Sequence, residues 1–227
     1  RDDQLYVRDR EWEAAHTIWL WADQSPSMLY KSDVALVSKE SRGLVLMLAL
    51  AEILARSGER VGCPGVMELV SSRNAAERLA LALAHAPVQT TLPDLGRIGR
   101  MSDVVLIGDF LDADDTLESC IGPAARRGIH GHIIEISDPA EETFPYTGRT
   151  EFRDPETGQK LVAGRAETIA ADYRRAWLAR REALAQGVRR MGWSFLPHRT
   201  DRLASEALAA AHGRLSGIPA ARKAALA

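Results

Sequence analysis

Cysteine is scarce in this chain, with only Cys63 and Cys120 among its 227 residues. A framework of several disulfides is therefore excluded, and such scarcity is typical of a reducing compartment, in which both side chains would be buried thiols. We accordingly expect a cytoplasmic protein. The sequence also begins at Arg1 rather than at a methionine, so we expect it to be a piece of a longer protein.

Long hydrophobic runs and a strong net charge are also absent. The longest apolar run, Gly43 to Ala51, is far shorter than the roughly 20 residues that span a membrane. The net charge is only -2, which gives no general attraction to nucleic acid. We expect one domain over residues 1–215 and a loosely ordered tail over 216–227, with no membrane span and no nucleic-acid partner.

Strand and helix signals alternate along most of the chain. Apolar runs from His16 to Asp23 and from Ser102 to Phe110 are typical of buried strands. Between them, a helix is expected from Ser38, its N-cap, to about Ser57, apolar almost all round from Leu44 to Leu50. This alternation predicts an α/β fold with a doubly wound, mostly parallel sheet.

The pattern changes from about Glu141 onward. Residues 150–164, "TEFRDPETGQKLVAG", predict a β-hairpin, and a long helix is expected from about Arg165 to Met191. We expect this hairpin and helix to be an elaboration of the fold. A last strand and a final helix, capped by Asp201 and ending at Leu215, complete the prediction.

Oxygen-bearing side chains follow two of the predicted strands. In "IWLWADQSPSM", Asp23, Ser25 and Ser27 alternate after the first strand, and Asp109 ends the later strand "VVLIG". If these strands are neighbours at the switch point of the sheet, the four side chains converge there. Hydroxyls and carboxylates are hard ligands, so the sequence predicts a site for Mg²⁺ or Mn²⁺.

The string Asp23-Gln24-Ser25-Pro26-Ser27 matches D-x-S-x-S, the first motif of the metal-ion-dependent adhesion site of von Willebrand factor A domains. Its setting, "LYVRDREWEAAHTIWLWADQSPSM" with "SDVVLIGDFLD" further on, resembles the DUF58 family of bacterial von Willebrand A-like proteins. The resemblance covers nearly the whole chain and implies a von Willebrand A-like fold. It implies these metal-site residues: Asp23, Ser25, Ser27, Thr90 and Asp109.

The resemblance also implies how these residues act. The serines match ligands that touch the metal, and the aspartates act largely through water. The threonine comes from "VQTTLPDL", in which Thr90 is preferred and Thr91 is the alternative. The third motif departs from the common T-D-G pattern, because this chain reads Gly108-Asp109-Phe110.

The function implied by the resemblance is protein binding rather than catalysis. In such sites one coordination position often accepts a carboxylate from a partner, so that the metal bridges two proteins. Proteins of this family are commonly associated with MoxR-type AAA+ ATPases, which suggests a bacterial assembly or chaperone-like system. We therefore expect a metal-assisted protein–protein interaction module.

Two other classes of function remain open. The first is a phosphoryl-transfer or hydrolytic enzyme that uses Asp23 and Asp109 with Mg²⁺, although the P-loop and G-x-S-x-G patterns are both absent. The second is a structural domain whose site has lost its metal. The long helix carries several arginines that could form a basic face: Arg174, Arg175, Arg180, Arg181, Arg189 and Arg190. Acidic residues share that helix, and they favour a solvated surface instead.

Overall fold

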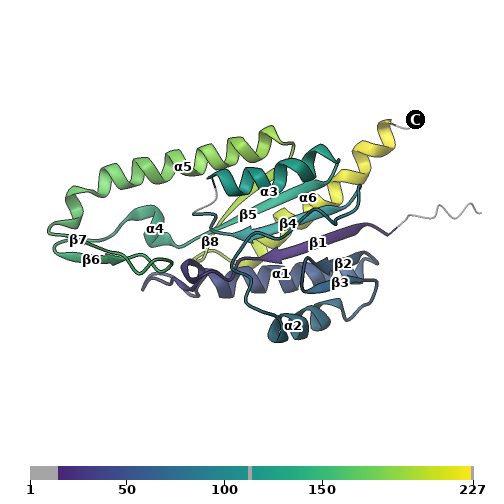
Figure 1. Ribbon diagram of the computed structural model, residues 1–227, viewed down its shortest axis with the longest axis horizontal. Coiled ribbons are helices and arrows are strands. Elements are labelled where there is room, and N and C mark those ends of the chain that lie inside the picture. Colours follow the sequence, from purple (N-terminus) through teal and green to yellow (C-terminus); the bar gives the residue numbers. More distant parts are fainter. Residues whose placement is uncertain (1–14, 112–113, 226–227) are drawn as a thin grey trace, which may run out of the picture.

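The computed structural model describes residues 15–111 and 114–225 and is built around a six-stranded sheet (Figure 1). Its strands, in spatial order, are β3 (Met67–Val70), β2 (Arg60–Cys63), β1 (Thr17–Ala22), β4 (Asp103–Gly108), β5 (His130–Ser137) and β8 (Ser194–Arg199). All neighbours are parallel except β3, which is antiparallel to β2 at one edge.

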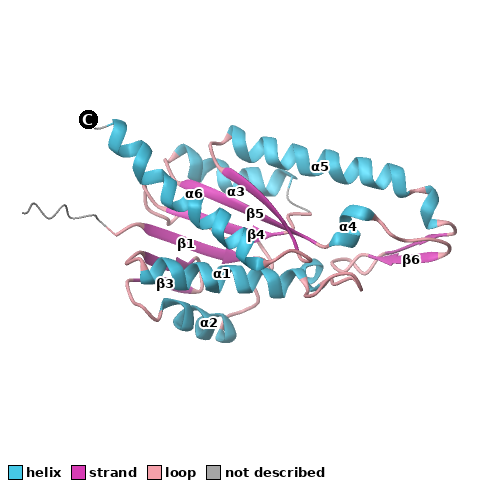
Figure 2. Ribbon diagram, turned by 180° about the vertical axis from the view of Figure 1, so that it is seen from behind, coloured by secondary structure: helices cyan, strands magenta, loops and turns pink. Residues whose placement is uncertain are grey.

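Helices cover both faces of the sheet (Figure 2). One face packs against α1 (Lys39–Arg56), α2 (Ala75–His85) and α6 (Ala204–Ala225), and the other against α3 (Asp114–Arg126) and α5 (Ala170–Arg190). Successive strand residues point to opposite faces, so Leu20 joins the first core and Trp21 the second. The predicted α/β fold with a mostly parallel sheet is confirmed.

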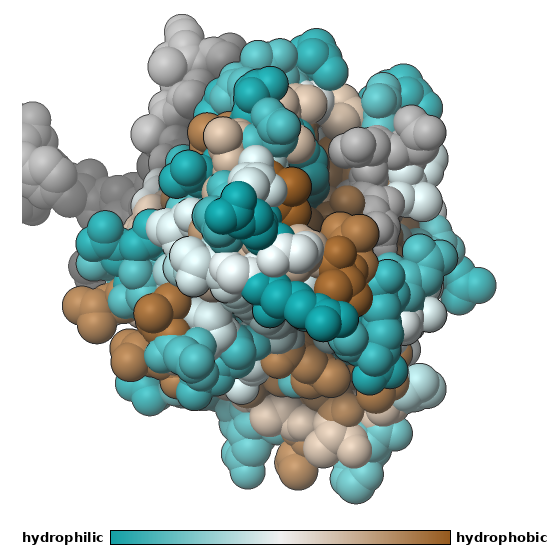
Figure 3. Space-filling view, turned by 90° about the vertical axis from the view of Figure 1, so that its left-hand side faces the viewer, coloured by the Kyte–Doolittle hydropathy of each residue, from teal (hydrophilic) through white to brown (hydrophobic). Residues whose placement is uncertain are grey.

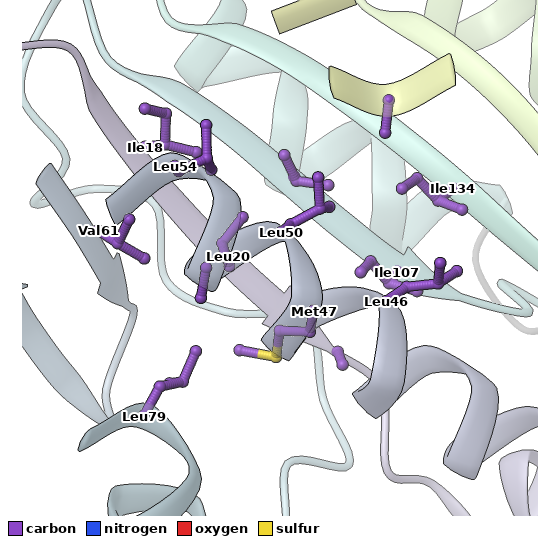
Figure 4. Close-up of a cluster of buried hydrophobic side chains, with 14 of the residues drawn as sticks. Ile18, Leu20, Leu46, Met47, Leu50, Leu54, Val61, Leu79, Ile107 and Ile134 are labelled. Atoms are coloured by element: carbon purple, nitrogen blue, oxygen red, sulfur yellow. The ribbon is translucent and has the colours of Figure 1, made fainter. Parts of the chain in front are cut away.

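The core beneath α1 is drawn in Figure 4, where Leu46, Leu50 and Leu54 lie between the helix and strand residues such as Leu20 and Ile107. Each of these side chains is at most 4% exposed. Burial of apolar surface stabilises the folded state by roughly 25 cal/mol for each Å² removed from water. This layer therefore holds α1 against β1 and β4. It therefore also fixes the N-terminal end of α1, which lies beside the candidate site.

The ends of α1 match the prediction, but its burial is less complete. The Ser38 side chain accepts a hydrogen bond from the Ser41 amide, and Gly58, just beyond the C-cap, has a φ of 85°. The apolar stretch from Leu44 to Leu50 predicts a deeply buried helix, and Leu46, Met47 and Leu50 are at most 1% exposed, whereas Val45 is 54% exposed. One side of α1 faces solvent even in its most apolar stretch.

The C-terminal half carries the predicted elaboration. The hairpin is formed by β6 (Thr150–Arg153) and β7 (Lys160–Ala163) as a separate two-stranded sheet. It extends from the main sheet beside the short helix α4 (Pro139–Thr143) and the first turns of α5 (Figure 1). The 3₁₀ turn η2 (Ala166–Thr168) leads into α5.

Aromatic side chains hold the hairpin to α4 and α5. The Phe144 ring lies 5.5 Å from that of Phe152 in the hairpin and 4.6 Å from that of Tyr173 in α5, measured between centroids. Tyr146 meets both phenylalanine rings edge-on. Because such contacts have a defined geometry, they give the projecting hairpin a fixed direction.

The final helix differs from the prediction at both ends. Asp201 does not cap it, because its carboxylate binds the Arg199 guanidinium at 2.6 Å and the helix begins at Ala204. The helix continues past the expected end at Leu215 to Ala225. The loose order proposed for 216–227 stays a prediction.

The two cysteines do not pair with each other: Cys63 is buried in the sheet and Cys120 is half-buried in α3. Burial raises the pKa of the Cys63 thiol to about 12, so it remains protonated near neutral pH. Within the described residues, no helix is both long and apolar enough to cross a bilayer.

Candidate functional site

The carboxyl ends of β1 and β4 lie side by side. The two strands are parallel, with Ala22 opposite Ile107, and the Asp23 amide extends the ladder by donating to the Ile107 carbonyl at 2.8 Å. The chain returns from β1 through α1 on one face and from β4 through α3 on the other, so this edge is the switch point of the sheet. Asp23 and Asp109 follow these strands directly.

Gly108 allows the two strand ends to approach closely. A Cβ atom placed on this residue would stand 2.9 Å from the Asp23 Cβ. The Gly108-Asp109-Phe110 triplet therefore has a packing reason for its glycine. At Phe110 the backbone turns sharply with a φ of 51°, an uncommon value for a residue with a side chain.

The two serines are presented by a 3₁₀ turn, η1 (Pro26–Leu29). The Asp23 carboxylate accepts a hydrogen bond from the Ser25 amide at 2.8 Å, and Pro26 starts the turn with its fixed φ. The buried Met28 anchors the turn in the core. This arrangement brings the Ser25 and Ser27 hydroxyl oxygens to 3.1 Å from each other.

Asp109 is hydrogen-bonded to residues of both η1 and α1. Its Oδ2 accepts hydrogen bonds from the Ser27 hydroxyl and from the Lys39 ammonium, each at 2.8 Å. Its Oδ1 accepts a bond from the Leu111 amide at 3.2 Å. We refer to Asp23, Ser25, Ser27 and Asp109 together as the serine site.

Lys39 is a member of this region that sequence reasoning missed. The side chain is buried, and its ammonium lies between Asp109 at 2.8 Å and Glu141 of α4 at 2.6 Å. Burial opposes its charge, but the two carboxylates outweigh burial and raise the pKa of Lys39. A lysine in the first turn of an apolar helix is unfavourable for the helix dipole, and that was the available signal.

Glu156 is the second residue that was missed. It lies in the turn of the hairpin, and its Oε1 accepts a hydrogen bond from the Ser27 amide at 2.8 Å. The sequence predicted this turn but not where it points. The hairpin therefore brings a third carboxylate to the serine site.

Asp23 is the titratable group most affected by this crowding. Its pKa is raised to about 6, first by burial and further by the charges of Asp109 and Glu156, although the Ser25 amide opposes the shift. Concentrated negative charge of this kind favours a bound cation.

The two candidate threonines lie across from the serine turn. The Gln24 amide donates to the Gln89 carbonyl at 2.7 Å, and the Gln89 amide donates back to the Gln24 side chain at 3.2 Å. This reciprocal pair holds the loop that carries Thr90 and Thr91. Both threonines are exposed and line the same cavity as the serine site.

That cavity has a volume of about 720 Å³ and lies between the serine site, the loop after α2 and helix α3. All five residues predicted for the metal site line it, and so does Glu156. The residues at its polar end are Asp23, Ser25, Ser27, Thr90, Thr91, Asp109 and Glu156. The sequence prediction that Asp23, Ser25, Ser27 and Asp109 converge is therefore matched by their positions.

The donor set fits a small divalent cation. Adjacent ligands of an octahedral Mg²⁺, each about 2.1 Å from the metal, stand roughly 3.0 Å apart, and the two serine oxygens are 3.1 Å apart. Because Ser27 donates its proton to Asp109, Ser25 is the donor in the contact between the two serines, and one lone pair of Ser27 is left to face a cation. The described residues contain no cluster of three His, Cys, Asp or Glu side chains suited to a metal, so any site here depends on the hydroxyls.

A second cluster of charged residues lies toward the carboxyl ends of the neighbouring strands β5 and β8. Glu135 is 1% exposed, and its carboxylate binds Arg181 of α5 at 2.6 Å and Arg180 at 3.5 Å. Arg181 also binds Glu142 at 2.7 Å, and Glu142 meets Arg199 at 3.5 Å. We call these five residues the arginine cluster. The prediction that these helix arginines form a solvated face was wrong for Arg180 and Arg181.

Arg180 connects the two clusters. Its Nη2 donates to the carbonyl oxygens of Asp109 and Phe110, both at 2.7 Å. These bonds hold the strained turn after β4. Helix α5 therefore helps to set the position of Asp109 without contributing a side chain to the cavity.

Comparison with known proteins gives distant structural matches. A protein described as conserved hypothetical protein BatB, from Bacteroides thetaiotaomicron, is 17% identical, with 79% of this chain and 99% of that chain covered and a TM-score of 0.42. An aerotolerance-related membrane protein from Bacteroides fragilis NCTC 9343, with multiple mutations to serines, is 14% identical, with 86% and 96% covered and a TM-score of 0.46.

No curated protein matches the chain. A family match, in contrast, extends over residues 1–183, which include the serine site as well as Arg180 and Arg181 of α5. The quoted N-terminal string begins within residues 1–14, which lie outside the described structure. The matched family is the one described as "Protein of unknown function DUF58", and the chain belongs to it.

Proposed function

We propose that this chain is a von Willebrand A-like domain that binds a partner protein through a divalent cation at the serine site. The antiparallel strand β3 beside an otherwise parallel sheet, with the site at the β1–β4 switch point, supports the fold assignment. One observation carries the functional proposal: two serine hydroxyls stand 3.1 Å apart while one of them donates to a buried aspartate.

In this proposal Ser25 and Ser27 hold Mg²⁺ or Mn²⁺ directly, and Thr90, with Thr91 as the alternative, faces it from the opposite loop. Asp23 and Asp109 act largely through water, and Asp109 also orients the Ser27 hydroxyl. The cation supplies a positive centre that accepts a carboxylate from the partner. The chain's own residues provide the orientation and the negative charge that keep the cation in place.

The partner proposed for this site is a MoxR-type AAA+ ATPase within a bacterial assembly or chaperone-like system. The test is Mg²⁺-dependent binding between the purified chain and a MoxR-type ATPase of the same organism, measured by biolayer interferometry. Binding should require Mg²⁺ or Mn²⁺ and should be lost in Ser25→Ala. Binding of equal strength in chelator would contradict the metal-bridged contact.

A phosphoryl-transfer or hydrolytic enzyme is the second candidate, and Lys39 is the residue that could favour it, since a lysine often accompanies phosphate chemistry. However, Lys39 is buried, bound by two carboxylates, and not part of the cavity lining. Its position suits the orientation of Asp109 better than contact with a substrate. Turnover of a phosphate ester that Asp23→Asn abolishes would reverse this preference.

A further inference from the structure

The cavity beside the serine site is much larger than a metal site needs. Its 720 Å³ lies within the range of roughly 300 to 1,000 Å³ that is typical of ligand pockets. Its apolar part is formed by residues from β1, the loop after α2, the turn after β4 and helix α3: Trp21, Leu92, Leu95, Phe110, Cys120 and Ala124. This apolar part and the polar end form one continuous space.

The apolar floor of the cavity is buried in the core, whereas the mouth of the cavity is accessible. Trp21, Leu95 and Phe110 are at most 5% exposed and belong to the core between the sheet and α3. Leu111, which also lines the cavity, is 40% exposed. A ligand whose polar group is bound at the serine site would therefore place a neighbouring apolar group over a preformed floor.

We propose that this cavity is a second recognition subsite, which takes an aromatic or branched apolar side chain next to the partner carboxylate that binds at the serine site. The inference rests on the proposed function, because the carboxylate is held through the cation. It adds a chemical specification of the partner: an acidic residue with a large apolar neighbour.

Charge decides between an acidic and a basic occupant. Three carboxylates, Asp23, Asp109 and Glu156, line the polar end, and the nearby Lys39 does not line the cavity. Without a cation this end repels a carboxylate and would favour an amine. A divalent cation bound between the serines offsets two of these charges and can coordinate a carboxylate directly, so the occupant depends on the metal.

The probes are phenylacetate, 3-phenylpropionate and 4-phenylbutyrate, which vary the distance from carboxylate to ring, with propionate as the ring-free control. Binding to the full chain is measured by isothermal titration calorimetry in Mg²⁺ and in chelator. We expect at least one phenylalkanoate to bind tenfold or more tightly than propionate, only with Mg²⁺. Equal affinities for all four in Mg²⁺ would overturn the subsite.

A variant that fills the cavity tests its location. Ser119 of α3 is exposed and lines the cavity, so Ser119→Trp should abolish the tenfold gain from the ring while Mg²⁺ still binds. Glu118→Trp, on the same helix and also exposed but outside this cavity, is the matched control and should keep the gain. Retention of the gain in Ser119→Trp would overturn the assignment.

The outcomes also separate this inference from the proposed function. Mg²⁺ binding without a gain from the ring overturns the subsite alone. Failure of Mg²⁺ to bind overturns the proposed function and, with it, the subsite. Binding of benzylamine in chelator that is tighter than that of any phenylalkanoate in Mg²⁺ would identify a site for apolar amines and overturn the acidic partner.

Discussion

Two groups of charged residues lie at the same edge of the sheet, but they are built in opposite ways. In the arginine cluster, at β5 and β8, every carboxylate meets a guanidinium within 3.5 Å. In the serine site, at β1 and β4, the Asp23 carboxylate is hydrogen-bonded by Ser25 rather than by a cation, and its pKa is raised to about 6. The first arrangement leaves its charges neutralised, and the second leaves negative charge facing a cavity.

The difference indicates which region is structural and which is available for binding. Arginines compensate the buried Glu135 and dock α5, so that region contributes to the fold. At the serine site, Lys39 binds Asp109 from outside the cavity, so the cavity side of this carboxylate stays open.

Figure 3 looks onto the end of the molecule that carries the hairpin, where hydrophobic residues interrupt a largely hydrophilic surface.

The largest expected effect comes from breaking the arginine cluster. Arg181→Met removes the closest partner of the buried Glu135 and should lower the free energy of unfolding by about 4 kcal/mol, measured in urea. Arg175→Met, which breaks the exposed pair with Asp172 on the same helix, should cost less than about 1 kcal/mol. Similar losses in both variants would contradict a structural role specific to the cluster.

Acid should destabilise the β5–β8 half through two buried histidines. Burial, with added repulsion from Arg42, lowers the pKa of His198 to about 4, and burial, with Arg214 and His130, lowers that of His132 to about 4. An unfolded histidine titrates near 6.5. Between these values the unfolded state binds more protons, so stability falls as the pH drops from 6.5 to 4.

The size of this effect is about 3 kcal/mol for each histidine over that pH range. His198→Gln and His132→Gln should each flatten the dependence of the unfolding free energy on pH. His85→Gln, an exposed position on α2, is the control and should leave it unchanged. A pH profile that neither buried variant alters would show that other groups dominate acid unfolding.

Lys39→Met should lower stability in chelator but increase the stabilising effect of Mg²⁺ at the serine site. Loss of the ammonium leaves Asp109 and Glu141 without their shared cation, and in chelator stability should fall by about 3 kcal/mol. The same change adds net negative charge, so Mg²⁺ should stabilise the variant more than the natural chain. Thermal unfolding with and without Mg²⁺ measures both quantities, and an unchanged Mg²⁺ effect would argue against a cation site next to Asp109.

The smallest expected effect concerns the hairpin. Glu156→Gln removes a nearby negative charge, and Mg²⁺ affinity measured by calorimetry should fall by a few-fold, or less than about 1 kcal/mol. Glu151→Gln, which lies on β6 and pairs with Lys160, should leave the affinity unchanged. An equal loss in both variants would mean that the turn of the hairpin has no special effect on the site.

The sequence predicted the strands and the four serine-site residues because those signals are local. Apolar runs define β1 and β4, and the polar residues follow them directly. Lys39 and Glu156 were missed because their partners lie far away in the chain, at separations of 70 and 129 residues. The direction in which a hairpin points depends on packing, here on Phe144 and its aromatic neighbours, and hydrophobic periodicity carries no such information.

The arginines of α5 show a related limit. The acidic residues Asp172 and Glu182 on the same helix favour a solvated surface for Arg180 and Arg181. Their true partner, Glu135, stands in the otherwise apolar strand β5, "HGHIIEIS". A buried carboxylate in such a strand requires a cation, so the need for a partner was readable although its identity was not.

The most direct test of the account is thermal unfolding of the purified chain in chelator, Mg²⁺ and Mn²⁺, with Asp23→Ala and Arg175→Met measured alongside. A cation that binds only the folded state at 100 times its dissociation constant adds about 2.7 kcal/mol of stability. We predict a metal-dependent rise in the natural chain and in Arg175→Met that is lost in Asp23→Ala. An equal rise in all three, or none in the natural chain, would contradict a cation site at the ends of β1 and β4.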